Sequence, residues 1–246
     1  MQRRRPKVYN LTCIFVTVNK VPWMEYHNKV MLKAIGDFPL ITVSRHPMPH
    51  LPGEKLIQDG EQSHDNMFKQ LLRGAKLATT DYIAIIEDDI LYHEDHFAFR
   101  PPLDTIAFNW NRWSLFTWGE PTYHFKRRIC GGVSILPRLL MIDAIEERVK
   151  KWGTVPHHLN GELGFPMVDK NLGVTVRKNM IYYSKTPVVQ IHHIYGVPGI
   201  GRPPSMVKPG DTVDLEKRKT RKRMGMIRAY DIDHWGRSEL LVKKFR

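Results

Sequence analysis

The stretch YIAIIEDDILY, residues 82–92, decides the fold of this chain. Its apolar run Tyr82–Ile86 has the length and β-branched content of a fully buried parallel strand. Three carboxylates, Glu87, Asp88 and Asp89, follow at once. Like charges this close raise one another's pKa unless a cation neutralises them, and ligands of open α/β sheets bind at the carboxyl ends of strands. The pattern predicts a hard-cation site at the sheet edge; a solvated turn is the alternative.

The segment before this strand predicts a helix that leads into it. Ser63 stands where an N-cap is expected. Apolar residues then recur at helical spacing, namely Met67, Leu71, Ala75 and Ala78. Helix followed by buried strand is the repeating unit of an α/β fold.

Residues 63–97, SHDNMFKQLLRGAKLATTDYIAIIEDDILYHEDHF, resemble the core of GT-A glycosyltransferases. In that family an Asn-containing helix, here with Asn66, leads into a strand that ends in a "DxD" acid motif, here Glu87-Asp88-Asp89. The continuation through Leu91, Tyr92, His96 and Phe97 is closer still to phage and bacterial TET-associated glycosyltransferases. The resemblance implies a single α/β domain with a mixed, mostly parallel sheet flanked by helices. It also implies transfer of a sugar to hydroxymethylated bases in DNA.

Composition agrees with one domain of this size. The chain has 246 residues, of which 42% are hydrophobic, and its mean hydropathy is −0.39. No apolar run approaches the roughly 20 residues that span a bilayer, and the N-terminus lacks a signal-peptide pattern. We therefore expect no membrane span, a monomer, and a cytoplasmic location, in the host cell if the gene is carried by a phage. Cys13 and Cys130 have no metal-ligand spacing and are expected to be buried thiols.

The first half of the chain predicts a β-α-β unit that holds the donor. Residues 8–18 and 39–44 are expected strands, and residues 23–35 an expected helix. In a GT-A fold the donor's nucleotide lies at the exit of the first strand, which here carries Thr17 and Asn19. Arg45, in the proline-rich loop after the second strand, is a candidate phosphate ligand; an ordinary loop and a surface arginine are the alternatives.

Aromatic and basic residues dominate the segment after the acid motif. Residues 108–123, FNWNRWSLFTWGEPTY, hold three of the six tryptophans and suit either a stacking platform for a base or sugar, with Trp118 and Tyr123, or a buried strand pair. Lys126, Arg127 and Arg128 add a cationic step suited to flipped-base recognition.

The general base and the pocket wall are assigned by the resemblance. Gly131 and Gly132 resemble the Gly-Gly turn that lines the pocket between donor and acceptor in GT-A enzymes, where glycine permits a close backbone approach. Glu162 is the first candidate for the base of an inverting transfer and Asp169 the second. Capping of a helix or a surface position is the alternative for these acids.

A late histidine is expected to complete the metal site. Residues 187–196 predict a strand, so the consecutive His192 and His193 point to opposite faces. In GT-A enzymes such a histidine commonly ligates the metal, and the resemblance selects His193 as the partner of Asp89. Glu87 or Asp88 then contacts the ribose or the metal. Carboxylate, imidazole and diphosphate oxygens suit Mn²⁺ or Mg²⁺; a hydrogen-bonded core histidine is the alternative.

Charge points to a polyanionic partner. The formal net charge is +13, and the segment from Glu216 to Arg223 concentrates cations. Together with the basic arm of residues 1–7, these predict salt-sensitive contact with a phosphate backbone. Residues 199–210 are a candidate lid over the donor. The DNA-contacting candidates in the basic segment are Lys217, Arg218, Arg221, Lys222 and Arg223.

The combined prediction is one GT-A domain over residues 1–246. It comprises the basic arm 1–7, a nucleotide-sugar half 8–100, an acceptor half with lid 101–210 and a basic segment 211–246. The predicted reaction moves a sugar from a nucleotide-diphosphate donor, a UDP-sugar, onto the hydroxyl of a 5-hydroxymethylpyrimidine in DNA. Two alternatives stay open: a transferase acting on a lipid or surface glycan, and a non-catalytic DNA-binding protein on a transferase scaffold.

Overall fold

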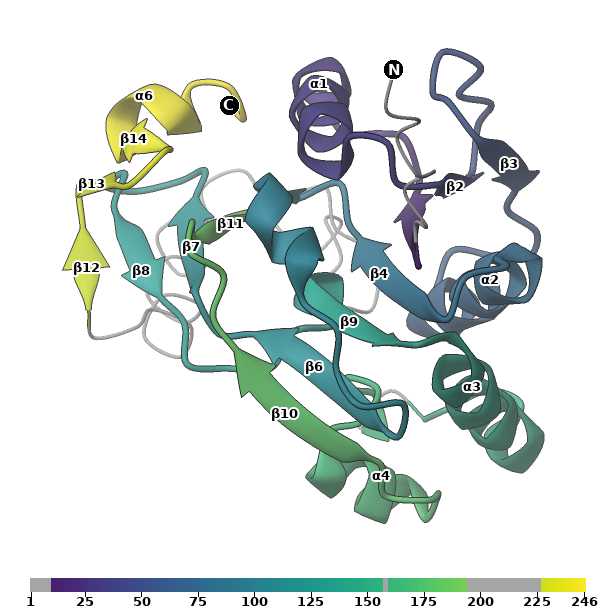
Figure 1. The fold of residues 1–246 in the computed structure, drawn as a ribbon. Helices are drawn as coiled ribbons and strands as arrows, with labels where there is room; N and C mark the ends of the chain where they lie inside the picture. The colour runs from purple at the N-terminus through teal and green to yellow at the C-terminus, as the bar shows by residue number, and fades with distance from the viewer. Residues whose placement is uncertain (1–9, 157–158, 194–226) are drawn as a thin grey trace, which may run out of the picture.

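The computed structural model describes residues 10–156, 159–193 and 227–246. The basic arm, the candidate lid and the basic segment 216–223 therefore lie outside the described residues. A seven-stranded sheet forms the centre of the molecule (Figure 1). Its strand order is β10 (Lys178–Tyr182), β6 (Thr105–Asn109), β9 (Ser134–Pro137), β4 (Tyr82–Ile86), β1 (Leu11–Thr17), β2 (Leu40–Ser44) and β3 (Glu54–Ile57).

The central sheet is mixed and mostly parallel. Strands β3, β2, β1 and β4 are parallel neighbours, and β6 pairs parallel with β10. Only β9 runs antiparallel, between β4 and β6. The predicted fold class, a single α/β domain with a mostly parallel sheet flanked by helices, is confirmed. The finer division into four segments stays a prediction.

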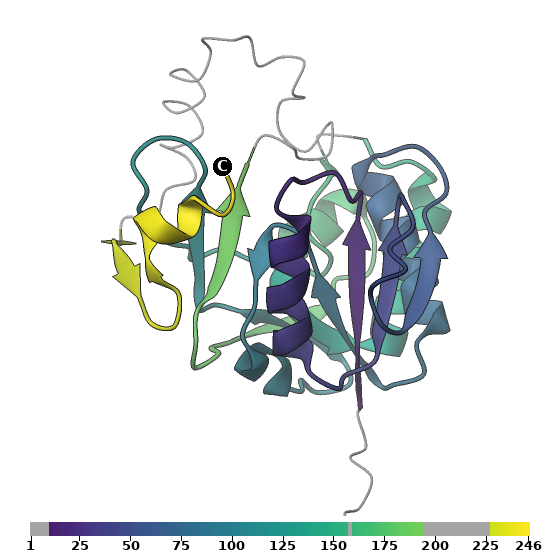
Figure 2. The same ribbon diagram turned by 90° about the horizontal axis from the view of Figure 1, so that it is seen from above.

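Alternating side chains of the central strands pack against opposite layers. Leu11, Cys13 and Phe15 of β1 belong to the same core cluster as α1 (Met24–Ile35). Ile14, between them, joins the cluster of α2 (His64–Leu77) and α3 (Arg138–Trp152) on the other face (Figure 2). This sandwiching explains why the central strands read as continuous apolar runs.

A second sheet of five strands lies beside the first. Its order is β12 (Arg228–Ala229), β8 (Tyr123–Phe125), β7 (Arg112–Phe116), β11 (Val188–His192) and β5 (Ile90–Leu91). The C-terminal hairpin β13 (Asp231–Ile232) and β14 (Gly236–Arg237), with α6 (Ser238–Val242), packs next to it (Figure 1). The remaining elements are η1 (Glu94–Ala98), η2 (Gly131–Val133) and α4 (Pro166–Leu172).

Most expected elements form where the sequence predicts them. Ser63 caps α2 as predicted, because its hydroxyl accepts the N–H of Asn66 at 3.0 Å. Strands β3 and β10, both at edges of the central sheet, were not predicted. Cys13 and Cys130 are free and buried, as expected. None of the described helices is both long and apolar enough to cross a membrane.

Candidate functional site

The acid triplet joins the two sheets. Strand β4 ends at Ile86 in the central sheet, and β5 begins at Ile90 in the second sheet. Glu87, Asp88 and Asp89 are the three residues between them. Each carboxylate therefore lies where two sheets meet, and elements from both sheets reach it.

Asp88 faces the exit of β1. The Thr17 hydroxyl donates a hydrogen bond to Asp88 Oδ2, and the same hydroxyl oxygen accepts the N–H of Asn19 at 2.8 Å. Asn19 has a φ of 54°, in the left-handed region that asparagine tolerates. The indole of Trp23 donates to the Asp88 carbonyl at 3.0 Å. The structure thus brings together Thr17, Asn19 and Asp88, three of the residues predicted to bind the donor.

Asp89 is held by β11. The Ile191 N–H donates to the Asp89 carbonyl at 2.6 Å, and the Gln190 amide approaches Asp89 Oδ2 at 3.5 Å. His193 Nε2 lies 4.0 Å from the same oxygen. Burial, followed by the charge of Asp88, raises the pKa of Asp89 to about 7. The predicted pair Asp89 and His193 therefore lies together.

The two consecutive histidines point to opposite sides, as predicted. His192 Nε2 lies 2.8 Å from the Ser114 hydroxyl and its ring stacks on Phe116. His193 instead packs edge-on against Trp23 beside the acid triplet. Burial lowers the pKa of His193, which favours the neutral imidazole that a metal ligand requires.

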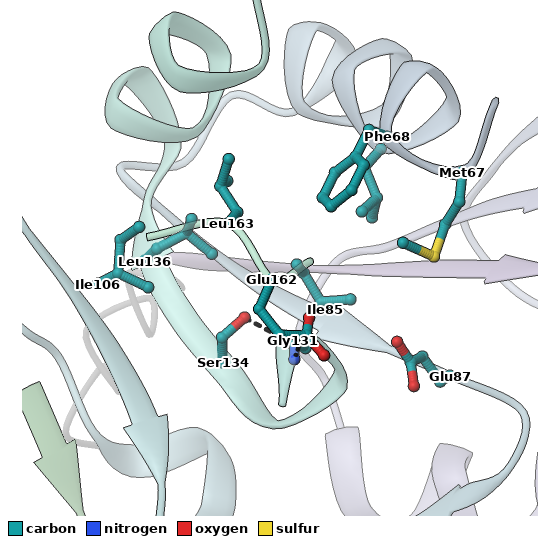
Figure 3. A pocket seen from close by; sticks show the side chains of 11 residues that line it. Met67, Phe68, Ile85, Glu87, Ile106, Gly131, Ser134, Leu136, Glu162 and Leu163 are labelled. Atoms are coloured by element: carbon teal, nitrogen blue, oxygen red, sulfur yellow. Dashed lines mark hydrogen bonds between the residues drawn. The ribbon is translucent and has the colours of Figure 1, made fainter. Parts of the chain in front are cut away.

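Glu87 and Glu162 lie against the Gly-Gly turn (Figure 3). The Gly131 N–H donates to Glu162 Oε2 at 2.8 Å. A Cβ at Gly131 would lie 2.6 Å from that oxygen, and a Cβ at Gly132 would lie 2.5 Å from the Glu87 carboxylate. Only glycine leaves room for both acids. This close approach is what the resemblance predicted for the turn.

Both glutamates have raised pKa values. Burial raises the pKa of Glu87 well above its ordinary value, and the carboxylates of Asp89, Glu162 and Asp88 raise it further. Burial also raises the pKa of Glu162, although the Gly131 N–H opposes the rise. Tyr92 fixes the approach of the two segments, since its hydroxyl accepts the Glu87 N–H at 3.1 Å and donates to the Gly132 carbonyl at 2.6 Å.

A recess opens between these glutamates and the face of α2. Its empty space is about 340 Å³ when the open solvent at its mouth is counted, but only about 20 Å³ of it can take the centre of a water-sized molecule. Glu87, Glu162, Gly131 and Ser134 supply the polar lining (Figure 3). The remaining wall is apolar and comes from Met67, Phe68, Leu71, Ile85, Ile106, Leu136 and Leu163. Its lining is of the kind found in small-molecule sites, although its enclosed space is that of a solvent molecule.

Asp89 and His193 are side chains of the types that ligate divalent cations, and they lie side by side. Within residues 10–156, 159–193 and 227–246, no three histidine, cysteine or acidic side chains are arranged to hold a metal by themselves. Asp89 Oδ1 is nevertheless buried without a hydrogen-bond partner in the described part of the chain. Such an oxygen is costly unless a cation or a donor reaches it. Asp89 and His193 thus offer two ligands, and the other positions remain for water or substrate oxygens.

Two predicted donor residues have structural partners. Asn66 lies at the start of α2, where its amide donates to the Asp59 carbonyl at 2.9 Å and accepts from Gln70 at 2.7 Å. Arg45 donates to the Gly60 carbonyl. Both side chains hold the loop between β3 and α2. For Arg45 this agrees with the alternative of a surface arginine.

Asp169 is engaged in a different part of the molecule from the acid triplet. It lies in α4, where its carboxylate is 3.6 Å from buried Arg148 and accepts the Arg177 N–H at 3.4 Å. Glu162, in contrast, lines the recess. The structure therefore separates the two candidates for the general base and places Glu162, not Asp169, at the recess.

The predicted aromatic platform is largely core. Tyr123 is fully buried in the main core cluster, so the expectation that it contacts the acceptor is wrong. Trp118 packs edge-on against Phe116, and buried Lys126 lies 5.7 Å from the same ring. Arg127 and Arg128 are exposed. The five candidates from Lys217 to Arg223 lie outside the described residues.

Sequence reasoning missed the contacts that organise the site. Arg112 of β7 stands opposite Val188 of β11 in the parallel register, and its side chain donates to Gln190, two residues further along β11. Tyr92 and Trp23 reach the triplet from other elements. No spacing signal in the sequence joins positions so far apart along the chain.

No protein-family profile and no curated protein sequence matches this chain. Several solved structures share parts of its fold at low similarity. The apo-form glycosyltransferase GlyE of Streptococcus pneumoniae TIGR4 is 12% identical, with a TM-score of 0.45, over 69% of this chain and 44% of that chain. A glycosyltransferase involved in glycosylation of the major capsid of PBCV-1 is 10% identical, with a TM-score of 0.39, over 84% of this chain and 99% of that chain.

A nucleotidyltransferase shows a similar degree of likeness. The inositol-1-phosphate CTP transferase of T. maritima is 10% identical, with a TM-score of 0.45, and the match covers 85% of this chain and 97% of that chain. Likenesses of this size identify neither a family nor an activity.

Proposed function

We propose that this chain is a metal-dependent glycosyltransferase that moves a sugar from a nucleotide-diphosphate donor onto a hydroxyl group. One observation carries the proposal. Asp89 at the carboxyl end of the central strand lies 4.0 Å from His193, beside a recess that contains Glu87 and Glu162. The carboxyl edge of a mostly parallel sheet is where such folds bind nucleotides.

Asp89 and His193 are the residues that would hold Mn²⁺ or Mg²⁺. When bound, a divalent cation neutralises negative charge that develops on a diphosphate leaving group. Thr17 and Asn19, beside Asp88 at the exit of β1, are placed for hydrogen bonds to the nucleotide. Glu87 faces the recess, where its carboxylate is available to sugar or ribose hydroxyls.

Glu162 is the proposed general base. The acceptor hydroxyl forms a bond from its oxygen to the anomeric carbon of the sugar, the bond from that carbon to the diphosphate oxygen breaks, and Glu162 takes the hydroxyl proton. The raised pKa of Glu162 suits this role, because a base is most effective when its pKa approaches the working pH. A single displacement of this kind inverts the anomeric configuration.

The proposed acceptor is a 5-hydroxymethylpyrimidine in DNA. The net charge of +13 and the exposed Arg127 and Arg128 support a polyanionic acceptor. The base must leave the duplex for its hydroxyl to reach the recess. The sequence resemblance of residues 63–97 supports the same acceptor.

The test offers labelled nucleotide sugars, with Mn²⁺, to hydroxymethylated DNA, unmodified DNA and a membrane extract. Labelled nucleosides from hydroxymethylated DNA alone are the expected result. Asp89→Asn should lower turnover by roughly 100-fold or more, because several kcal/mol of charge stabilisation are lost. Label in the lipid fraction would mean that the acceptor is a lipid and not DNA. DNA retention without any donor turnover would indicate a binding protein and sink the proposal.

A further inference from the structure

Arg112 is a buried cation close to the acid triplet. It extends from β7, is 4% exposed, and forms no ion pair within the described ranges of the chain. Its guanidinium donates to the Gln190 side-chain oxygen and, at 2.9 Å, to the Arg128 carbonyl. Its Nε is buried without a hydrogen-bond partner in the same ranges. A buried charge with only neutral partners is costly to retain unless nearby charges compensate it.

The acids of the site are influenced by the Arg112 charge. The Arg112 charge lowers the pKa values of Glu87, Asp89 and Glu162, against the larger effect of burial. Arg112 forms no ion pair with these acids in the described part of the chain, so its contact with Asp89 runs through Gln190.

Gln190 connects Arg112 to Asp89. A guanidinium has only donors, so the oxygen of the Gln190 amide must face Arg112. The amide nitrogen then faces Asp89 Oδ2, at 3.5 Å. Arg112 thus decides which end of the amide meets the aspartate. A free glutamine could rotate and present its oxygen to the carboxylate instead.

The consequence is a fixed orientation of Asp89. Its carbonyl is held by the Ile191 N–H, and its Oδ2 faces Gln190 and His193. Oδ1 is left buried and without a hydrogen-bond partner among described residues. Residues that orient a ligating carboxylate in this way commonly affect metal affinity.

We propose that Arg112 and Gln190 act as a positioning pair that fixes the Asp89 carboxylate for a divalent cation. This inference rests on the proposed function, since it assumes that Asp89 is a metal ligand. A purely structural role, in which the pair only ties β7 to β11, makes a different prediction: substitutions would lower stability and leave cation binding unchanged.

The test measures binding of Mn²⁺ in the presence of UDP, from the loss of the free-Mn²⁺ signal in electron paramagnetic resonance. The variants are Gln190→Met, which keeps the side-chain length, Arg112→Met, Arg112→Lys and the double Met variant. Asn179→Leu is the matched control, because its amide donates to the Gly164 carbonyl at 2.9 Å on the edge strand β10. Melting temperatures and sugar-transfer kinetics are recorded for each variant.

Gln190→Met and Arg112→Met should each weaken Mn²⁺ binding by about 10- to 100-fold, whereas Asn179→Leu should match the wild type. The double variant should lose no more than the worse single variant, because the two residues act as one unit. Arg112→Lys should recover part of the loss, since it keeps the charge and a donor.

Unchanged Mn²⁺ binding in folded Gln190→Met overturns this inference and leaves the proposed function standing. Because Gln190→Met preserves side-chain length, it stays informative if Arg112→Met fails to fold. A wild-type protein that neither binds Mn²⁺ with UDP nor transfers sugar overturns the proposed function and this inference together.

Discussion

Glu162 is half-buried and Asp169 is buried, and their surroundings give them different tasks. Glu162 faces the recess and receives a backbone N–H from the Gly-Gly turn. Asp169 compensates the buried charge of Arg148. The first arrangement leaves a carboxylate accessible to an incoming hydroxyl, whereas the second is occupied with holding α4 to α3.

At this scale we predict opposite outcomes for two conservative substitutions. Glu162→Gln should lower kcat by roughly 100- to 10,000-fold with little change in donor KM, because the proton acceptor is removed. Asp169→Asn should lower the free energy of unfolding by about 3 kcal/mol, because it leaves Arg148 unpaired, while the folded enzyme keeps its kcat. Steady-state kinetics and urea denaturation distinguish them, and a reversal would assign the base to Asp169.

At the scale of elements, buried His96 joins η1 to the two strands at the far edge of the sheet. His96 Nδ1 lies 3.0 Å from the amide nitrogen of Asn109 at the end of β6, and 3.1 Å from the Tyr182 hydroxyl of β10. The side chain is fully buried. Burial lowers its pKa to about 3, an effect that the nearby Asp95 opposes.

The lowered pKa predicts a loss of stability in acid. In the unfolded chain His96 takes up a proton below about pH 6.5, whereas the folded chain does so only near pH 3, so the unfolded state binds more protons between these values. Stability should therefore fall as pH drops through this window, by up to about 5 kcal/mol from this residue. In urea denaturation between pH 7 and 4, the free energy of unfolding should change less steeply with pH in His96→Gln than in the wild type. Substitution of exposed His46 by Gln is the control, and equal slopes in the two variants would contradict the assignment.

The elements also show how far sequence carries. Apolar runs and caps predict α1, α2, β1, β2, β4 and β11 to within a few residues. The edge strands β3 and β10 were missed because Glu54, Lys55 and Lys178 break the apolar pattern that marks a buried strand. The proximity of Asp89 and His193 was predicted from the resemblance. The Arg112–Gln190 contact did not, because it depends on the register of β7 with β11.

At the scale of the whole molecule, excess positive charge predicts salt-dependent binding to DNA. Exposed Arg127 and Arg128 follow β8, which lies between β12 and β7 in the second sheet. Replacing both with glutamine should reduce the slope of log K against log salt by about 2, if each neutralises one phosphate. The charge-matched control replaces exposed Lys69 of α2 and Lys170 of α4. Fluorescence anisotropy at several salt concentrations gives the slopes; equal changes in both pairs would mean that only net charge matters.

The crossover of the acid triplet from one sheet to the other also matters for motion. Asp89 leaves the central sheet, while His193 arrives from the second. An ion bound by both residues would link the two sheets. Amide hydrogen exchange should then slow in β4 and β11 together when Mn²⁺ and nucleotide are added. Bound substrate would therefore make the junction between the two sheets more rigid.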